Sequence, residues 1–253
     1  AWVARGYYLW SVERDWLGAE AALARALELE PNDSFVLERV ALHAYLLGRF
    51  EETESLIQQM EEQDALTPRA EVWRGNVLLL KAAFGDLDFE PALRFFDDLI
   101  TREPHLALAR QSRGWTLSLA GRLEEGLEAV GASLRLAPEM PSARGLRGAL
   151  LARLGRTEEA RAEDARFREA AAAGTADPYC QSFIYFALGE IERGFDLAEE
   201  AAAGRTSRML PLVRLVPEYR SLWDHPRFLA LMDAIWPGEQ KQVLGECGWR
   251  PGS

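Results

Sequence analysis

The sequence predicts an all-α protein, a right-handed α-solenoid of six helical hairpins with a C-terminal helical cap. Two observations carry this prediction. Small residues recur along the chain at a nearly constant period of 34 residues, and apolar residues recur between them at three- and four-residue spacing. A period of that size is typical of stacked repeats, because a single helix pair cannot bury its apolar face alone.

Two series of small residues set the register. The first series has steps of 34, 39, 34, 34 and 34 and comprises Ala19, Thr53, Ala92, Gly126, Ala160 and Gly194. The second has steps of 35, 34, 39, 34 and 34 and comprises Gly6, Ala41, Gly75, Gly114, Gly148 and Ser182. Small side chains let the backbones of two crossing helices approach each other. We therefore expect these positions where the two helices of each hairpin cross.

The register divides the chain into repeats and two end segments. The repeats span about 1–31, 32–65, 66–104, 105–138, 139–173 and 174–203, followed by a cap at 204–236 and a mostly mobile tail at 237–253. Breaks between the paired helices are expected near Gly48, Gly121, Gly155 and Gly189, where a left-handed backbone is cheapest for glycine. One extra residue falls within SVERDW, and five fall in the expected loop AFGDLDFEP. The stretch REAAAAG predicts a long second helix in the fifth repeat.

The residues at these positions resemble the tetratricopeptide (TPR) pattern over about residues 1 to 203. The matching residues are Trp2, Gly6, Leu9, Ala19, Leu23, Ala26 and Pro31, and again Ala92, Phe96, Pro104, Gly114, Leu117, Gly126 and Pro138. One position departs from the pattern, because Asp164 stands where an apolar residue is usual. The resemblance implies a helical scaffold that binds other proteins.

A second resemblance concerns the segment MLPLVRLVPEYRSLWDHPRFLALMDAIWPG, beginning at Met209. It is similar to the segment that ends the TPR regions of bacterial signalling proteins such as winged-helix regulators, adenylate cyclases and kinases. Asp224 or His225 is placed to cap a helix whose face comprises Phe228, Leu231 and Ile235. We expect this helix to cover the sixth repeat.

Composition excludes several classes of function. Hydrophobic residues make up 48% and charged residues 27% of the 253 residues, which is typical of a globular protein. The net charge of -11 opposes nucleic-acid binding, and no apolar run is long enough for a membrane span. Two cysteines far apart, Cys180 and Cys247, favour a reducing compartment, so a cytoplasmic location is expected. The beginning AWVARGYYLW, without an initiator Met or a signal sequence, is interpreted as the start of a piece of a longer protein.

Catalytic patterns are weak, so we expect no enzyme, no cofactor and no metal. The three histidines, His43, His105 and His225, show neither metal-ligand spacing nor a neighbouring nucleophile. The acidic pair Glu124 and Glu125 recurs one period later, at the start of a second helix, where negative charge suits the helix dipole.

A partner is expected to bind in a concave groove lined by the first helices. The groove positions are Tyr7, Trp10, Glu38, Leu42, Tyr45, Asn76, Leu79, Gln111, Trp115, Ser118, Tyr179 and Phe183, with Val3, Val72, Gly145, Ala149, Ala152 and Phe186 completing the lining. Aromatic side chains in a groove are typical anchors for a partner segment. Alternatively, the aromatic side chains at the two ends of the repeat stack, Tyr7 with Trp10 and Phe183 with Phe186, belong to the hydrophobic core.

The sequence therefore predicts a non-catalytic scaffold that binds a protein or peptide partner. This partner is either another protein or another region of the same full-length chain. One alternative is the sensor region of a bacterial signalling protein that binds a small apolar ligand. The other is an enzyme on a helical scaffold.

Overall fold

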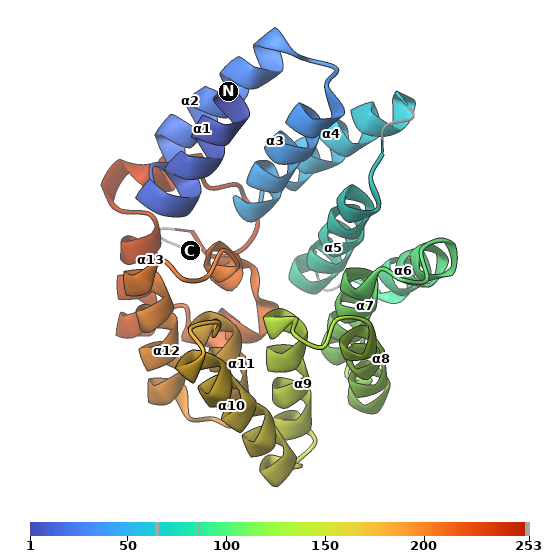
Figure 1. Ribbon diagram of the computed structural model, residues 1–253, viewed down its shortest axis with the longest axis vertical. Helices are drawn as coiled ribbons and strands as arrows, with labels where there is room; N and C mark the ends of the chain where they lie inside the picture. Colours follow the sequence, from blue (N-terminus) through green and yellow to red (C-terminus); the bar gives the residue numbers. More distant parts are fainter. Residues whose placement is uncertain (64–65, 86, 251–253) are drawn as a thin grey trace. The chain divides into compact units, whose positions relative to one another are not determined.

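The computed structural model describes residues 1–63, 66–85 and 87–250, and within these ranges the regular structure is entirely helical. The chain divides into two compact units. The first comprises Ala1–Leu87 together with the residues from Pro211 onward, and the second comprises Asp88–Leu210. Each unit contains successive helix pairs (Figure 1), which confirms the all-α, repeat-based fold class.

The first unit holds the helices of the first two repeats, the first helix of the third, and most of the C-terminal segment. Its elements are α1 Trp2–Tyr8, the π-helical turn η1 Leu9–Glu13, α2 Trp16–Leu29, α3 Ser34–Leu46, α4 Phe50–Glu62, α5 Pro68–Gly85, the 3₁₀ helices η3 Pro217–Leu222 and η4 Gly238–Val243, and α13 Pro226–Ile235. A further 3₁₀ helix, η2 Leu210–Leu215, begins at the last residue of the second unit.

The second unit is continuous in sequence. Its helices are α6 Glu90–Arg102, α7 Ala107–Leu119, α8 Leu123–Leu136, α9 Pro141–Arg153, α10 Thr157–Ala172, α11 Pro178–Ala187 and α12 Ile191–Gly204. In Figure 1 these helices run from green to orange, each packed on the next along the chain. Helix α10 has 16 residues, which confirms the long second helix expected in the fifth repeat.

The two predicted insertions, in SVERDW and in AFGDLDFEP, lie partly within helical structure and do not simply lengthen loops. The extra residue in SVERDW lies at the end of α1, where Leu9–Glu13 forms a π-helical turn that ends at Arg14 with a left-handed backbone (φ 59°). A single extra residue widens a helical turn in this way. The expected loop AFGDLDFEP is wrong in extent, because α5 continues to Gly85 and α6 already begins at Glu90.

The four glycine breaks are confirmed. Each glycine has a positive φ, between 67° and 78°, immediately after the first helix of its pair, at Gly48, Gly121, Gly155 and Gly189. Helix crossings follow the small-residue series in the repeat that contains Gly114. A Cβ atom on Gly114 would lie 3.0 Å from the carbonyl oxygen of Gly126, so the α7 and α8 backbones are in near contact.

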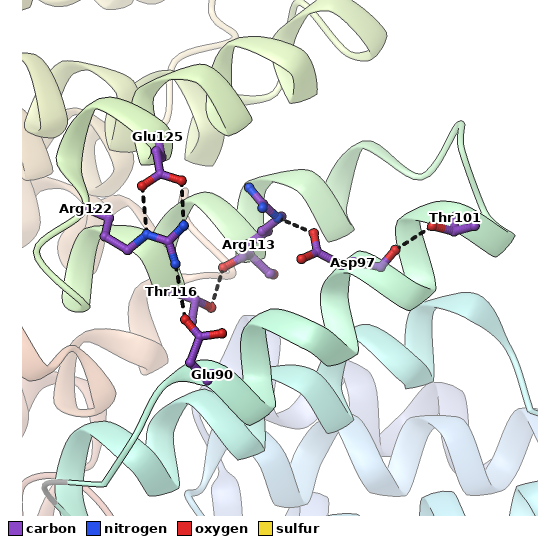
Figure 2. Close-up of polar contacts among 8 residues, drawn as sticks. Glu90, Asp97, Thr101, Arg113, Thr116, Arg122 and Glu125 are labelled. Carbon is purple, nitrogen blue, oxygen red and sulfur yellow. Dashed lines mark hydrogen bonds and ion pairs between the residues drawn. The ribbon is translucent and has the colours of Figure 1, made fainter.

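A polar network holds α6, α7 and α8 together (Figure 2). Arg122 lies between α7 and α8 and donates two hydrogen bonds to Glu125 (2.8 and 2.5 Å) and one to Glu90 on α6 (3.2 Å). Arg113 on α7 pairs with Asp97 on α6 (2.5 Å). Glu125 at the start of α8 therefore binds the arginine before the helix as well as lying near its positive dipole end.

The same device recurs one period later. Arg156 precedes α10 and donates two hydrogen bonds to Glu159 (2.6 and 2.7 Å), and it lies 3.8 Å from Glu124 of the previous repeat. The recurrence agrees with the predicted place of the acidic pairs in the first turn of the second helix, although no side-chain hydrogen bond among the described residues caps α8 or α10. The sequence interpretation missed the arginine, which follows the glycine break in both repeats.

The C-terminal residues differ from the expected cap and mobile tail. Phe228, Leu231 and Ile235 do form one apolar face, each 1% exposed, and His225 rather than Asp224 caps α13. Residues 211–250, which we call the C-terminal clasp, belong to the unit of the first repeats, whereas the sixth repeat lies in the other unit. Val243, Leu244 and Trp249 are buried in the region expected to be a tail.

Aromatic contacts explain where the clasp packs. Trp236 of the clasp is fully buried and packs on Trp16 of α2 in a tilted arrangement, with ring centroids 5.5 Å apart. Trp16 also stacks on Trp10, at 5.7 Å. The C-terminal residues therefore help to bury the aromatic cluster of Trp10 and Trp16 near the start of the chain.

Burial of His43 beside Trp16 predicts a pH-dependent stability. Burial, with the nearby charge of Arg49 adding to it, lowers the pKa of His43 to about 3. The unfolded chain takes up a proton below about pH 6.5 whereas the folded chain does not, so stability falls as the pH drops. We expect a loss of about 2 kcal/mol between pH 6.5 and pH 5.

Urea unfolding of the parent and of His43→Leu across this pH range checks the prediction. The variant should show a shallower dependence than the parent. Equal slopes would mean that His43 is protonated in the folded protein.

Candidate functional site

The candidate site is the face of the second unit formed by the first helices of three repeats, α7, α9 and α11. Gln111, Trp115 and Ser118 come from α7, and Ala149 and Ala152 come from α9. Phe183 and Phe186 come from α11. The 34-residue register brings these positions to equivalent places on successive helices, as the repeat pattern requires.

Side-chain contacts show that these three helices lie side by side. Ser142 of α9 donates a hydrogen bond to the Gln111 amide oxygen of α7 (2.8 Å). Arg153 at the end of α9 donates to the Ser118 hydroxyl oxygen (2.5 Å) and to its carbonyl (3.2 Å). A Cβ atom on Gly145 would lie 3.1 Å from the ring of Phe183. The face is therefore continuous from α7 to α11.

Three aromatic rings on this face are only partly buried. Trp115 packs against the core cluster of Val130, Leu134, Ala143, Leu146 and Leu150 while keeping part of its surface accessible. Phe183 packs edge-to-face on the buried Tyr179 (4.9 Å), and Phe186 packs on Phe195 (5.3 Å). Rings supported from behind and accessible in front are suited to anchor a partner.

A buried charge cluster supports α9 and α10 behind this face. The Glu163 carboxylate is 3% exposed and pairs with Arg147, with Arg166 (3.0 Å) and with Arg144 (3.4 Å). The neighbouring Asp164 accepts a hydrogen bond from Gln181 of α11 (2.7 Å) and pairs with Arg168 (2.9 Å). The cluster connects three helices, and Asp164 is the residue that departs from the expected apolar pattern.

The predicted groove residues of the first unit are less accessible. Trp10, Tyr45, Asn76 and Leu79 are between 0% and 9% exposed, and Trp10 belongs to the aromatic core around Trp16. Tyr7, Glu38 and Leu42 are partly exposed. In the second unit, Gln111, Trp115 and Phe183 are partly exposed, whereas Ser118 and Tyr179 are buried.

Potential metal-binding side chains and two of the histidines can be placed in the described part of the chain. No group of three His, Cys, Asp or Glu side chains in the described ranges could hold a metal ion. His43 packs on Trp16, and the ring of His225 accepts a hydrogen bond from the amide of Arg227. Both histidines thus have structural roles.

Two surface cavities of the second unit differ in their linings: the first mixes charged side chains with Pro, Phe and Ala, and the second is lined mainly by charged side chains. The first, of about 520 Å³, includes Glu139, Arg144, Arg166, Glu169 and Asp177. The second, of about 730 Å³, lies over α8 and α10 and includes Glu124, Glu128, Arg135, Arg147, Arg156 and Glu159. The lining of the second cavity does not favour an apolar small molecule.

Comparison with known proteins gives information on the fold alone. No family model and no curated protein matches the chain. Among solved structures, the chain is similar to TTC0263, a thermophilic TPR protein of Thermus thermophilus, with a TM-score of 0.54 at 18% identity over 74% of this chain and 98% of that one.

The similarity to TTC0263, together with the successive helix pairs, shows that the chain has a TPR-type fold. Human IFIT1, solved as a dimer with PPP-AAAA, matches with a TM-score of 0.46 at 14% identity, over 93% of this chain and 57% of that one. The TPR-type fold agrees with the repeat pattern read from the sequence. Within the described residues, no helix combines the length and apolar character needed to cross a membrane.

Proposed function

We propose that this TPR-type chain is a non-catalytic scaffold that binds a protein or peptide segment along the face of α7, α9 and α11. The observation that supports the proposal most is the continuous face on which Trp115 and Phe183 are backed by core residues and remain partly accessible. An aromatic anchor held by packing loses little conformational freedom on binding.

Polar groups beside the anchors suit a peptide backbone. The Gln111 amide and the Ser142 hydroxyl bond to each other at 2.8 Å, close to the position of Trp115 on α7. An amide offers both donors and an acceptor, so it can pair with main-chain N–H and C=O groups. The face thus combines apolar anchoring with backbone recognition, as peptide-binding grooves do.

The alternatives receive less support. A sensor region for a small apolar ligand would need an apolar cavity, whereas the cavity over α8 and α10 has a mainly charged lining and the other cavity a mixed one. An enzyme would need a reactive group in a suitable pocket. The histidines with defined contacts instead serve packing and helix capping.

Truncating Trp115 should weaken partner binding. We expect Trp115→Ala to cost about 2 kcal/mol of binding free energy, roughly 30-fold in Kd, because the anchor is lost from a supported site. Peptides selected from a displayed random library against the parent protein provide the probe, and their affinities for parent and variant are measured by fluorescence anisotropy.

Two controls separate binding from folding. Phe35→Ala removes another ring, 56% exposed on α3, and should leave peptide affinity unchanged. Circular dichroism should show that Trp115→Ala keeps its helical content. Equal affinity for Trp115→Ala and the parent would move the binding surface away from this face.

A further inference from the structure

The C-terminal clasp contacts the same edge of three consecutive repeats. It meets the α1–α2 turn around Arg14 and Trp16, the α3–α4 turn at Leu47 to Arg49, and the end of α5 at Ala83 and Phe84. Trp223 of the clasp stacks on Phe84 with ring centroids 6.1 Å apart. The edge of the first three repeats therefore already binds a segment of the chain that lies outside the repeats.

Recognition of this segment works largely through its main chain. Arg14 donates to the carbonyl of Ala234 (2.8 Å), and the Trp16 indole N–H donates to the carbonyl of Ile235 (2.9 Å). Arg49 donates to the carbonyl of Val243 (2.8 Å). Three side chains of the repeats thus bind carbonyl groups at the C-terminal ends of α13 and η4, where a helix leaves its last carbonyls without partners inside the helix.

Two contacts add selectivity to the carbonyl recognition. The ring of Trp236 is fully buried against Trp16, so the surface requires a large aromatic side chain next to the bonded carbonyls. Gly245 donates to the carbonyl of Leu47 (2.6 Å), and a Cβ atom on Gly245 would lie 2.5 Å from the backbone of Gly48. A glycine is therefore needed nine residues after the tryptophan.

The seated clasp leaves several buried polar atoms without a partner. Arg214 is 0% exposed and donates only to the carbonyls of Cys247 (2.7 Å) and Gly245 (3.0 Å), while its Nε atom is unpaired. The indole N–H groups of Trp223 and Trp236 are unpaired as well. Burying an unpaired polar group costs free energy. The clasp is therefore bound less tightly than the burial of its aromatic surface alone would predict.

We propose that the clasp is an exchangeable ligand, and that the edge of the first three repeats also accepts the clasp of a second copy of this chain. The second copy supplies the tryptophan, the carbonyl groups and the glycine at the required spacing. The connection from α12 to the clasp, residues 205–209, is non-helical and begins at Arg205 with a left-handed backbone (φ 52°). Exchange of a terminal element about such a hinge is a low-cost route to a dimer.

The chain's own clasp has the advantage at low concentration. A tethered segment has an effective concentration in the millimolar range, so the closed monomer dominates in dilute solution. Exchange becomes measurable when the resident clasp is weakened or when the protein is refolded at high concentration.

A labelled peptide of residues 211–250 tests the proposal on the full chain. Gly245→Ala weakens the resident clasp, because the added methyl group meets the backbone of Gly48 and Arg49. We expect this variant to bind the peptide at least about 10-fold more tightly than the parent chain does. Fluorescence anisotropy measures the affinity. If the variant is partly unfolded, a gain in helicity on adding the peptide, measured by circular dichroism, also reports binding.

Altered peptides are the matched controls, since they leave the protein unchanged. Peptides carrying Trp236→Ala or Gly245→Ala should bind the Gly245→Ala chain at least about 10-fold more weakly than the native peptide. Trp115→Ala in the chain should not affect peptide binding, which separates this surface from the face proposed for the partner.

Several outcomes would overturn the proposal. Absence of peptide binding to the Gly245→Ala chain, or equal affinity for the native and altered peptides, contradicts the recognition described here. Parent protein refolded at high concentration should contain a dimer by sedimentation velocity. A wholly monomeric product would contradict exchange between copies.

Discussion

Replacing Gly114 by leucine lowers the free energy of unfolding by about 3 kcal/mol, near the upper end of the usual overpacking cost. A Cβ atom at this position would lie 2.5 Å from Val130 Cγ2, 3.0 Å from the carbonyl oxygen of Gly126 and 3.3 Å from the Val130 amide nitrogen. Two of these three atoms belong to the backbone, which cannot move aside without separating α7 from α8. Urea denaturation followed by circular dichroism measures the loss.

Gly131→Ala is the matched control on α8. The nearest atom to an added Cβ there is Arg135 Nη1, at 3.7 Å, so the methyl group fits. Alanine is the better helix former, and we expect a gain of up to about 1 kcal/mol. Gly148→Leu should cost less than Gly114→Leu, because the three nearest atoms at Gly148 all belong to the side chains of Ile184 and Glu163, whereas two of the three at Gly114 are backbone atoms. Similar midpoints for Gly114→Leu and the parent would contradict the crossing of α7 and α8 at Gly114.

Replacing Glu163 by glutamine should cost about 3 kcal/mol, the low end of the range for breaking a buried ion pair. The carboxylate is 3% exposed and pairs with three guanidinium groups, of which Arg144 and Arg147 are 16% and 27% exposed. Without the negative charge, these partly buried cations lose their counter-ion. Arg166 is 51% exposed and can turn to water, which limits the loss.

Glu169→Gln on the same helix is the control for Glu163→Gln. It makes the same chemical change at an exposed position and should alter the unfolding free energy by less than about 0.5 kcal/mol. Equal stability of the two variants in urea would mean that the charge cluster contributes no net stabilisation.

Much of the repeat architecture followed from local sequence. The steps of 34 residues placed glycines at the breaks and at the α7–α8 crossing, because both roles depend on backbone conformation and close approach within one hairpin. The insertion in SVERDW was located for the same reason, although its π-helical form was not foreseen. The extension of α5 into AFGDLDFEP was missed, since a helix end depends on small differences in local free energy.

The candidate site could be read from the sequence only in part. The register named Gln111, Trp115 and Phe183, which lie partly exposed on neighbouring first helices. It could not show that Trp10, Tyr45 and Leu79 are buried, because the repeat register gives a position on a helix and not what packs against it. The Glu163 cluster was missed too, since its arginines are read as surface residues until the helices are packed.

The period, the helix pairs and the glycine breaks are thus properties of the sequence, because each depends on contacts within one or two neighbouring repeats. The placement of the clasp was decided by tertiary structure alone. The segment from residue 237 onward was predicted to be a mostly mobile tail, but within it Val243, Leu244 and Trp249 are buried and Gly245 lies against Gly48, about two hundred positions away. Such contacts arise from the free energy of burying aromatic rings between distant segments, which no local pattern encodes.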